Sequence, residues 1–228
     1  MSSNKLLSRL SRDDARLLDP HLEAVDLPVR KQLHVAKRRV DYIYFIERGV
    51  ASIVANGSHP IEVGMVGREG MTGTSVLLGD SERVPYDIYM QVAGTGQQMP
   101  ADRLRDAIAK SPALHRILLG YVHVFIIQAT QTALANARGK IEERLARWLL
   151  MVHDRIDGDE LTLTHEFLSV MLGVRRSGVT TALHELERKG LIESRRSFIA
   201  IMDREGLEES ATANESGSRH RRTCCRTS

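Results

Sequence analysis

The spacing of apolar residues changes twice along the chain. Leucines at helical intervals over residues 5–18 predict a short helix before Pro20. From there to about residue 99 the apolar residues form short β-rich runs, such as 41–57, with a turn at Glu47, Arg48 and Gly49, and 84–96. These runs predict a small antiparallel roll or sandwich.

Glycines recur at every third position within this β-rich region, at Gly64, Gly67, Gly70 and Gly73. Glycine permits positive φ angles and close approach of the backbone to a ligand. The repeat is typical of a series of tight turns in a roll. It also allows a second interpretation, in which exposed N–H groups cradle an anion.

A helical pattern begins at Pro100 and runs to about residue 156, with a break near Ser111 and Pro112. One stripe in it has coiled-coil spacing: Leu119, Val122, Ile126, Ala129 and Ala133. The opposite side is also apolar, at Leu118, Phe125 and Ile127. A helix that is apolar on both sides must be covered on both sides, which favours dimerisation over packing on the roll alone. We expect Trp148 to lie in the core of the following helix.

The segment 161–202 predicts two helices followed by a two-stranded wing. Thr164 caps the first helix, which ends at Gly173, a residue suited to a tight turn between helices. Val174 opens the second helix, with Val179, Leu183 and Leu186 facing inward. Two short strands then follow, 191–194 and 198–202, joined at residues 195–197.

The outward face of the second helix is the strongest functional signal. In a helix-turn-helix unit this helix enters the major groove by its amino end, and arginine can bind guanine O6 and N7 together or hold a phosphate. The residues expected to face DNA are Arg175, Arg176, Ser177, Thr180, Thr181 and His184 on the helix, with Arg195 and Arg196 in the wing. Each arginine alone would more often be a solvated surface charge, whereas their combination with the turn glycine and apolar face favours DNA.

Charge adds little to this interpretation. The net charge of +3 comes from the last twelve residues, which hold four arginines; without them, 28 basic residues face 29 acidic ones. This polar tail has few apolar residues to bury, and we expect it to be disordered.

Other classes of protein are disfavoured by the motifs. The two cysteines, Cys224 and Cys225, are neighbours in the tail, which argues against a disulfide framework, a four-cysteine metal site or an iron–sulfur cluster. No HExxH, GxSxG or GxxxxGK[ST] motif is present, so we expect no enzymatic activity and no metal site. With no run of eighteen apolar residues and a charged amino terminus, we expect a cytoplasmic protein.

Over roughly residues 20–208 the chain resembles the bacterial Crp/Fnr transcription regulators. The resemblance rests on three parts in the family's order: the strand pair YFIERGVASIV, the long helix, and the segment LTLTHEFLSVMLGVRRSGVTTALHELERKGLI. The resemblance implies an α+β fold: an N-terminal antiparallel β-roll (cyclic-nucleotide-binding-like jelly roll), a long dimerisation helix and a C-terminal winged helix-turn-helix. The expected domains are residues 1–110, 111–137 and 138–208, followed by the tail, 209–228. By the same resemblance Arg176, Ser177 and Thr181 match the positions that read bases.

The sensor half departs from the members of the family that bind cyclic AMP. They carry a glycine–glutamate pair and, further on, an arginine followed by a small residue and alanine. Here Arg68 stands between Gly67 and Glu69, and Arg83 is followed by Val84 and Pro85, where proline removes an N–H. Arg68, Glu69 and Arg83 are therefore weak candidates for effector binding, and we expect little or no affinity for cyclic AMP.

The sequence thus predicts a homodimeric regulator that binds an inverted repeat in double-stranded DNA. The resemblance implies RNA polymerase as a further partner, control by an unidentified effector, and no contact with membranes. The alternative is a ligand-binding or protein-interaction module whose winged helix does not read DNA.

Overall fold

The computed structural model describes residues 2–58, 60–79, 83–195 and 198–212. The chain divides after Thr132 into two compact units, an amino-terminal one and a carboxy-terminal one, each described here by itself. The carboxy-terminal tail expected to be disordered lies largely outside the described residues, as do Cys224 and Cys225.

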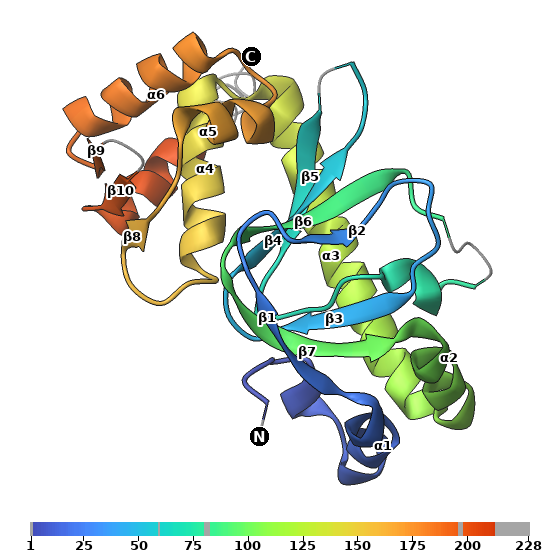
Figure 1. Cartoon of the computed structure of the whole chain (residues 1–228). Coiled ribbons are helices and arrows are strands. Elements are labelled where there is room, and N and C mark those ends of the chain that lie inside the picture. The colour runs from blue at the N-terminus through green and yellow to red at the C-terminus, as the bar shows by residue number, and fades with distance from the viewer. Residues whose placement is uncertain (1, 59, 80–82, 196–197, 213–228) are drawn as a thin grey trace, which may run out of the picture. The chain divides into compact units, whose positions relative to one another are not determined.

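The amino-terminal unit is built on two antiparallel sheets that form the predicted roll (Figure 1). One sheet has the order β1-β7-β3, with β1 at Glu23–Leu27, β7 at Gly94–Pro100 and β3 at Tyr42–Ile46. The other has the order β2-β6-β4-β5, with β2 at Gln32–His34, β6 at Tyr86–Val92, β4 at Val50–Ala55 and β5 at Ile61–Val66.

The turn between β3 and β4 falls where the sequence predicts it. Gly49 has a φ of 83°, and a Cβ at this position would lie 2.5 Å from the Val92 carbonyl oxygen. The backbone N–H groups of Glu47 and Arg48 both donate to the Thr95 carbonyl, which ties the turn to β7. Only glycine fits this conformation and this close approach without strain.

Helices surround the roll. The predicted helix over residues 5–18 is two elements, a 3₁₀ turn η1 at Leu7–Arg9 and α1 at Arg12–Leu18, because the Ser11 hydroxyl caps α1 by accepting from the Asp14 N–H. Further elements are η2 at Asp19–His21, η3 at Thr74–Leu77, α2 at Ala101–Lys110 and α3 at Pro112–Arg138. The predicted break near Ser111 is confirmed, since the Ser111 hydroxyl accepts from the Leu114 N–H at 3.1 Å.

The buried and exposed sides of α3 do not coincide with the seam and the opposite side that the sequence predicts. Val122, assigned to the seam, is only 6% exposed and packs in the core of the roll with Leu118. Ile127, assigned to the opposite side, is 49% exposed. The bare apolar face consists of Leu119, Val124, Ile126, Ile127 and Leu134. At about 100° per residue, Ile127 lies about 200° from Phe125 and Val122 only about 40° from Leu118, so the predicted sides did not separate the exposed residues from the buried ones.

By length and composition alone, α3 could also cross a membrane, because its most apolar eighteen-residue window has a mean hydropathy of 1.5. In the structure this helix is fixed to the roll. Leu114, Leu118 and Tyr121 are buried against it, and the Gln128 side-chain oxygen accepts from the Met65 N–H at 2.8 Å. The apolar character of α3 is thus used in part to close the core.

The carboxy-terminal unit contains α4 at Ile141–His153, α5 at His165–Leu172 and α6 at Arg176–Arg188. Its sheet has three strands, β8 at Glu160–Leu161, β10 at Phe198–Ile201 and β9 at Ile192–Arg195, in the order β8-β10-β9. The predicted two-stranded wing is therefore incomplete, because a two-residue strand before α5 pairs with β10. Trp148 is 5% exposed and lies in the core as expected, with its ring 6.4 Å from that of Phe167.

The chain after the wing adds a further helical segment, residues 204–212. Arg204 joins it to the end of α4, with guanidinium nitrogens 2.7 Å from His153 Nδ1 and 2.7 Å from Asp154 Oδ1. Leu207 from the same segment is fully buried. This segment is therefore part of the folded carboxy-terminal unit.

Candidate nucleic-acid interface and sensor half

The turn between α5 and α6 has the geometry that the sequence predicts. The Thr164 hydroxyl caps α5 by accepting from the Phe167 N–H at 3.2 Å. Gly173 ends the helix with φ 60° and ψ 38°, and its N–H donates to the Val170 carbonyl at 3.1 Å. This left-handed residue reverses the chain within two residues and sets the direction of α6.

The inner face of α6 is apolar and fully packed. Val179, Leu183 and Leu186 are at most 1% exposed, as predicted. Gly178 allows close contact with α4, since a Cβ there would lie 3.1 Å from the Ile141 Cδ1 atom. The helix begins at Arg176, with Arg175 as its N-cap, two residues later than the predicted start at Val174.

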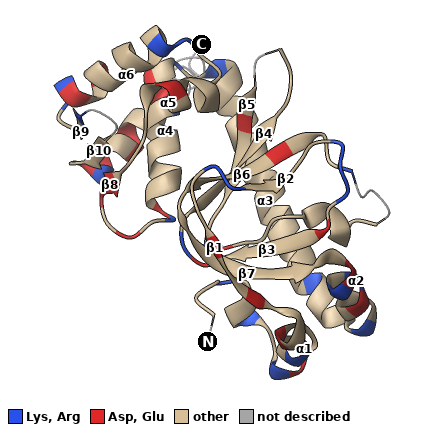
Figure 2. Cartoon of the chain, in the orientation of Figure 1, with Lys and Arg blue, Asp and Glu red and all other residues tan. Residues whose placement is uncertain are grey.

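The outer face of α6 carries most of the predicted DNA-facing residues. These exposed side chains are Arg175, Arg176, Ser177, Thr181 and His184. The first turn of α6 contains no acidic residue, so its unsatisfied backbone N–H groups and the two arginines give this end a positive potential. Figure 2 shows basic residues at this end of α6 and mixed charges at the other.

Thr180 lies apart from this exposed face. It is half-buried, and its hydroxyl lies 3.2 Å from the Nδ1 atom of His165 on α5. The hydroxyl also donates to the Arg176 carbonyl at 3.2 Å. Thr180 therefore contributes to the packing of α5 on α6. Sequence reasoning missed His165, whose position at the start of α5 was the available signal.

Acidic residues limit the cationic character of α6 to its amino end. Arg188 contacts the Glu185 carboxylate at 2.9 Å, and this hydrogen bond lowers the pKa of Glu185. His184 Nδ1 lies 3.3 Å from a Glu187 carboxylate oxygen. In the wing, Arg195 pairs with Glu193 at 2.6 Å, with both side chains largely exposed. Arg196 lies outside the described residues.

The weak effector candidates do not form one cluster around a shared ligand. Glu69 turns back on its own loop, where its carboxylate accepts from the Gly67 N–H at 3.2 Å. Arg83 is exposed and forms an isolated antiparallel bridge with Arg39. Of the four regularly spaced glycines, only Gly73 has a positive φ, at 74°. Gly67 and Gly70 nevertheless flank a tight turn, in which the Gly70 N–H donates to the Gly67 carbonyl at 3.1 Å. The interpretation as tight turns is wrong for Gly64, which lies within β5.

Aromatic rings from α3 lie close to two of these glycines. A Cβ on Gly70 would lie 2.3 Å from the Tyr121 ring, and one on Gly64 would lie 3.0 Å from the Phe125 ring. The Tyr121 hydroxyl also donates to the Met71 carbonyl at 3.1 Å. These glycines thus provide room for side chains of α3. Within the residues that the structure describes, no group of three or more histidine, cysteine or acidic residues could hold a metal ion.

Comparison with known proteins supports the assignment of the carboxy-terminal unit. The Crp-like helix-turn-helix domain matches residues 143–210, a range that includes α5, α6 and the wing. Curated protein sequences give no significant match.

Solved structures show the same fold over most of the chain. A putative Crp/Fnr-family transcriptional regulator from Eubacterium rectale has a TM-score of 0.71 and 17% identity, covering 90% of this chain and 97% of its own. FixK2 from Bradyrhizobium japonicum has a TM-score of 0.70 and 16% identity, covering 82% and 96%. The c-di-GMP-responsive global regulator CLP from Xanthomonas campestris has a TM-score of 0.66 and 17% identity, covering 84% and 99%.

The described elements have the order of the Crp/Fnr fold, namely antiparallel roll, long helix and winged helix-turn-helix. Residues 143–210 thus match a Crp-like helix-turn-helix domain, and the chain as a whole has the fold of solved Crp/Fnr-type regulators.

Proposed function

We propose that this protein regulates transcription as a homodimer that reads an inverted repeat, with one α6 in the major groove at each half-site. The observation that carries the proposal is the exposed, basic amino end of α6 on a helix whose other face is buried. Such a helix presents its first turns to base edges while its partner helix crosses the backbone.

Within this proposal the exposed residues have different roles. Arg176 at the first position of α6 reads a guanine, and Ser177 and Thr181 contact neighbouring bases or phosphates. Arg175 and the amino end of α6 hold a phosphate. His184, Arg195 and Arg196 contact the flanking backbone. Thr180 acts indirectly, by holding α5 against α6 through His165.

The bare apolar face of α3 supports the homodimer. Val124, Ile126 and Ile127 are each about half exposed, although they are large and apolar. Ile126 and Ile127 lie with Leu119 and Leu134 within about 100° of the helix circumference, where a second copy of α3 would bury them. The resulting symmetric pair would present two copies of α6, which corresponds to the symmetry of an inverted repeat.

We further propose that the protein works without cyclic AMP. Glu69 is engaged by its own loop, Tyr121 and Phe125 pack against the glycines of the segment, and Pro85 offers no N–H to a phosphate. Calorimetric titration with cyclic AMP tests this proposal, and saturable binding at micromolar concentrations would overturn it.

The cellular setting follows from the same function. We propose that the protein acts in the bacterial cytoplasm, where it affects RNA polymerase at the promoters it occupies, and that it binds rather than catalyses. The last twelve residues, with their four arginines, lie outside the described residues.

Selection of bound fragments from random duplex DNA is the experiment that tests operator recognition. The expected product is a palindrome with half-sites about one helical turn apart. Fluorescence anisotropy on that sequence should show affinity that falls steeply with salt, because several phosphates are neutralised per dimer. A module that uses its winged helix only to bind proteins would enrich no sequence and show no salt-dependent affinity.

A further inference from the structure

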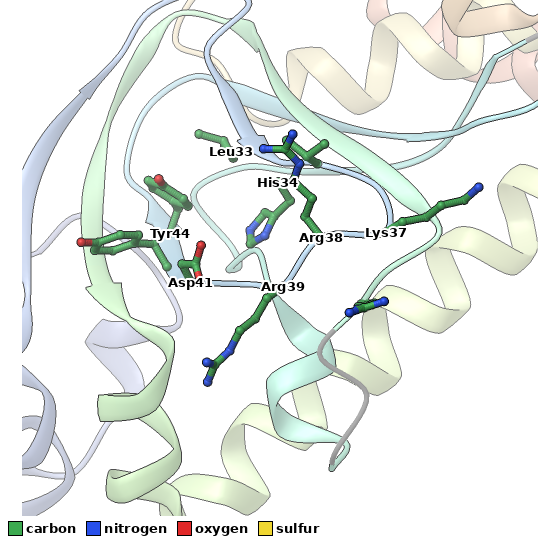
Figure 3. Close-up of a pocket in the computed structure, with 10 residues that line it drawn as sticks. Leu33, His34, Lys37, Arg38, Arg39, Asp41 and Tyr44 are labelled. Carbon is green, nitrogen blue, oxygen red and sulfur yellow. The ribbon is translucent and has the colours of Figure 1, made fainter.

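The amino-terminal unit contains a pocket of about 590 Å³ beside the loop between β2 and β3 (Figure 3). This volume suits a small organic molecule. The loop lines one side of the pocket, and Arg83 lines another. None of the four regularly spaced glycines lines this pocket.

Cationic side chains dominate the lining. Four of the lining residues are basic, Lys37, Arg38, Arg39 and Arg83, and one is acidic, Asp41. The four basic side chains are exposed, and Figure 3 shows Lys37, Arg38 and Arg39 spreading from the loop around the pocket. Arg39 also contacts the Asp102 carboxylate at 3.2 Å, but that carboxylate is shared with Arg105. The pocket therefore has a positive potential that favours anions.

The backbone at Lys37 supports a role for its charge. Lys37 has a φ of 64°, a left-handed conformation that favours glycine, and its N–H donates to the Val84 carbonyl at 2.7 Å. Glycine would be less strained at this position, so the presence of a lysine there points to a function for its charge.

The remaining lining offers a neutral and partly aromatic surface. Tyr42 is 44% exposed, and its ring can pack against a flat or apolar group. His34 is 5% exposed, and burial lowers its pKa to about 4, so the imidazole is neutral near pH 7. Its Nε2 atom lies 2.8 Å from the Thr72 hydroxyl.

We propose that this pocket binds a small organic phosphate, with the phosphate oxygens held by Lys37, Arg38 and their neighbours and the organic part against Tyr42. A phosphate monoester offers three oxygens and up to two negative charges, so it can satisfy several basic side chains at once. A monocarboxylate offers one charge and two oxygens, and is bound more weakly.

A short series of contacts leads from the pocket to α3. His34 contacts the Thr72 hydroxyl, which also accepts from the Tyr44 N–H at 3.2 Å. The residue before Thr72 is Met71, whose carbonyl accepts from the Tyr121 hydroxyl of α3 at 3.1 Å. A ligand that moves His34 would therefore act on the segment to which α3 is attached, which gives the site a route to regulation.

Isothermal titration calorimetry of the full-length protein tests the site, with phenyl phosphate, inorganic phosphate and benzoate as probes and no DNA present. The expected result is one saturable site per chain for phenyl phosphate, with weaker binding of the other two probes. Lys37→Gly and Arg38→Ala should each weaken phenyl phosphate binding about tenfold, as expected for the loss of one charge-assisted contact. Arg16→Ala, which removes an exposed positive charge from α1, should leave binding unchanged.

Two results would overturn the proposal. One is the absence of saturable binding by the unmodified protein up to roughly 10 mM phenyl phosphate, above the range of weak specific ligands. The other is binding of phenyl phosphate by Lys37→Gly and by Arg38→Ala that is as tight as binding by the unmodified protein. Glycine relaxes the backbone at position 37, so this variant should keep its thermal transition. Because no DNA is used, the outcome is independent of operator recognition.

Discussion

Replacing Arg176 with alanine is the most direct test of the proposal that α6 reads DNA. Arg176 is the first residue of α6 and is exposed, so its truncation removes no core contact, and alanine is a good helix former. The effect should therefore appear in binding rather than in stability. One arginine–guanine contact contributes about 1 to 3 kcal/mol of discrimination. Two half-sites double this loss to about 2 to 6 kcal/mol per dimer, or roughly 30-fold to 20,000-fold in affinity.

Fluorescence anisotropy at fixed salt provides the assay, with the selected palindrome and versions carrying one altered base pair in each half-site. Arg176→Ala should bind two sequences with similar affinity: the selected palindrome, and the version altered at the base pair that Arg176 is proposed to read. Arg188→Ala is the matched control, because it removes one exposed positive charge from the other end of α6, where Arg188 pairs with Glu185. It should change affinity less than about threefold. Equal loss by Arg176→Ala on every sequence would refute base reading and identify a phosphate contact.

Three further predictions concern stability and assembly. Burial lowers the pKa of His34 from 6.5 to about 4, so the stability of the amino-terminal unit should be fully present above pH 6.5 and fall by roughly 3 kcal/mol as the pH drops to 4 and below. Denaturant titrations across this range should show a flatter profile for His34→Gln, and an unchanged profile would contradict the assignment. Asn4→Ala should cost about 2 to 3 kcal/mol in urea unfolding, because the fully buried amide bonds the Ile46 and Gly70 carbonyls at 2.6 and 2.8 Å; a loss below 0.5 kcal/mol, the usual size for surface changes, would count against it. Ile126→Glu places a charge on the bare face of α3, where the side chain is 55% exposed, and should yield folded monomers in sedimentation velocity. A dimer that persists would place the interface elsewhere.

Local signals account for the parts of the fold that the sequence predicts well. Thr164, Gly173 and the apolar residues of α6 act within a few positions of one another, so capping, turn and buried face follow from spacing alone. The strand β8 was missed because it has two residues and exists only through pairing with β10, about forty positions later. A contact of that separation leaves no periodic pattern in a short strand.

In the candidate sites too, features set by neighbouring residues could be predicted, whereas contacts between distant segments could not. The exposed face of α6 could be predicted apart from Thr180, whose contact with His165 depends on the angle between two helices. Arg83 was grouped with Glu69 because the two are near in sequence, yet the structure pairs Arg83 with Arg39 across an isolated bridge. The pocket beside Lys37 was not predicted because its lining combines residues between Leu33 and Tyr44 with Arg83, which is distant in the sequence.

In the proposed homodimer, folding and association would both depend on α3. Its inner side seals the roll, whereas Ile126 and Ile127 are about half exposed in the single chain and would be covered by a second one. Association stabilises only the folded chain, so the melting temperature should rise with protein concentration. The number of copies in a cell would then set both how many regulators are assembled and how long each one survives proteolysis.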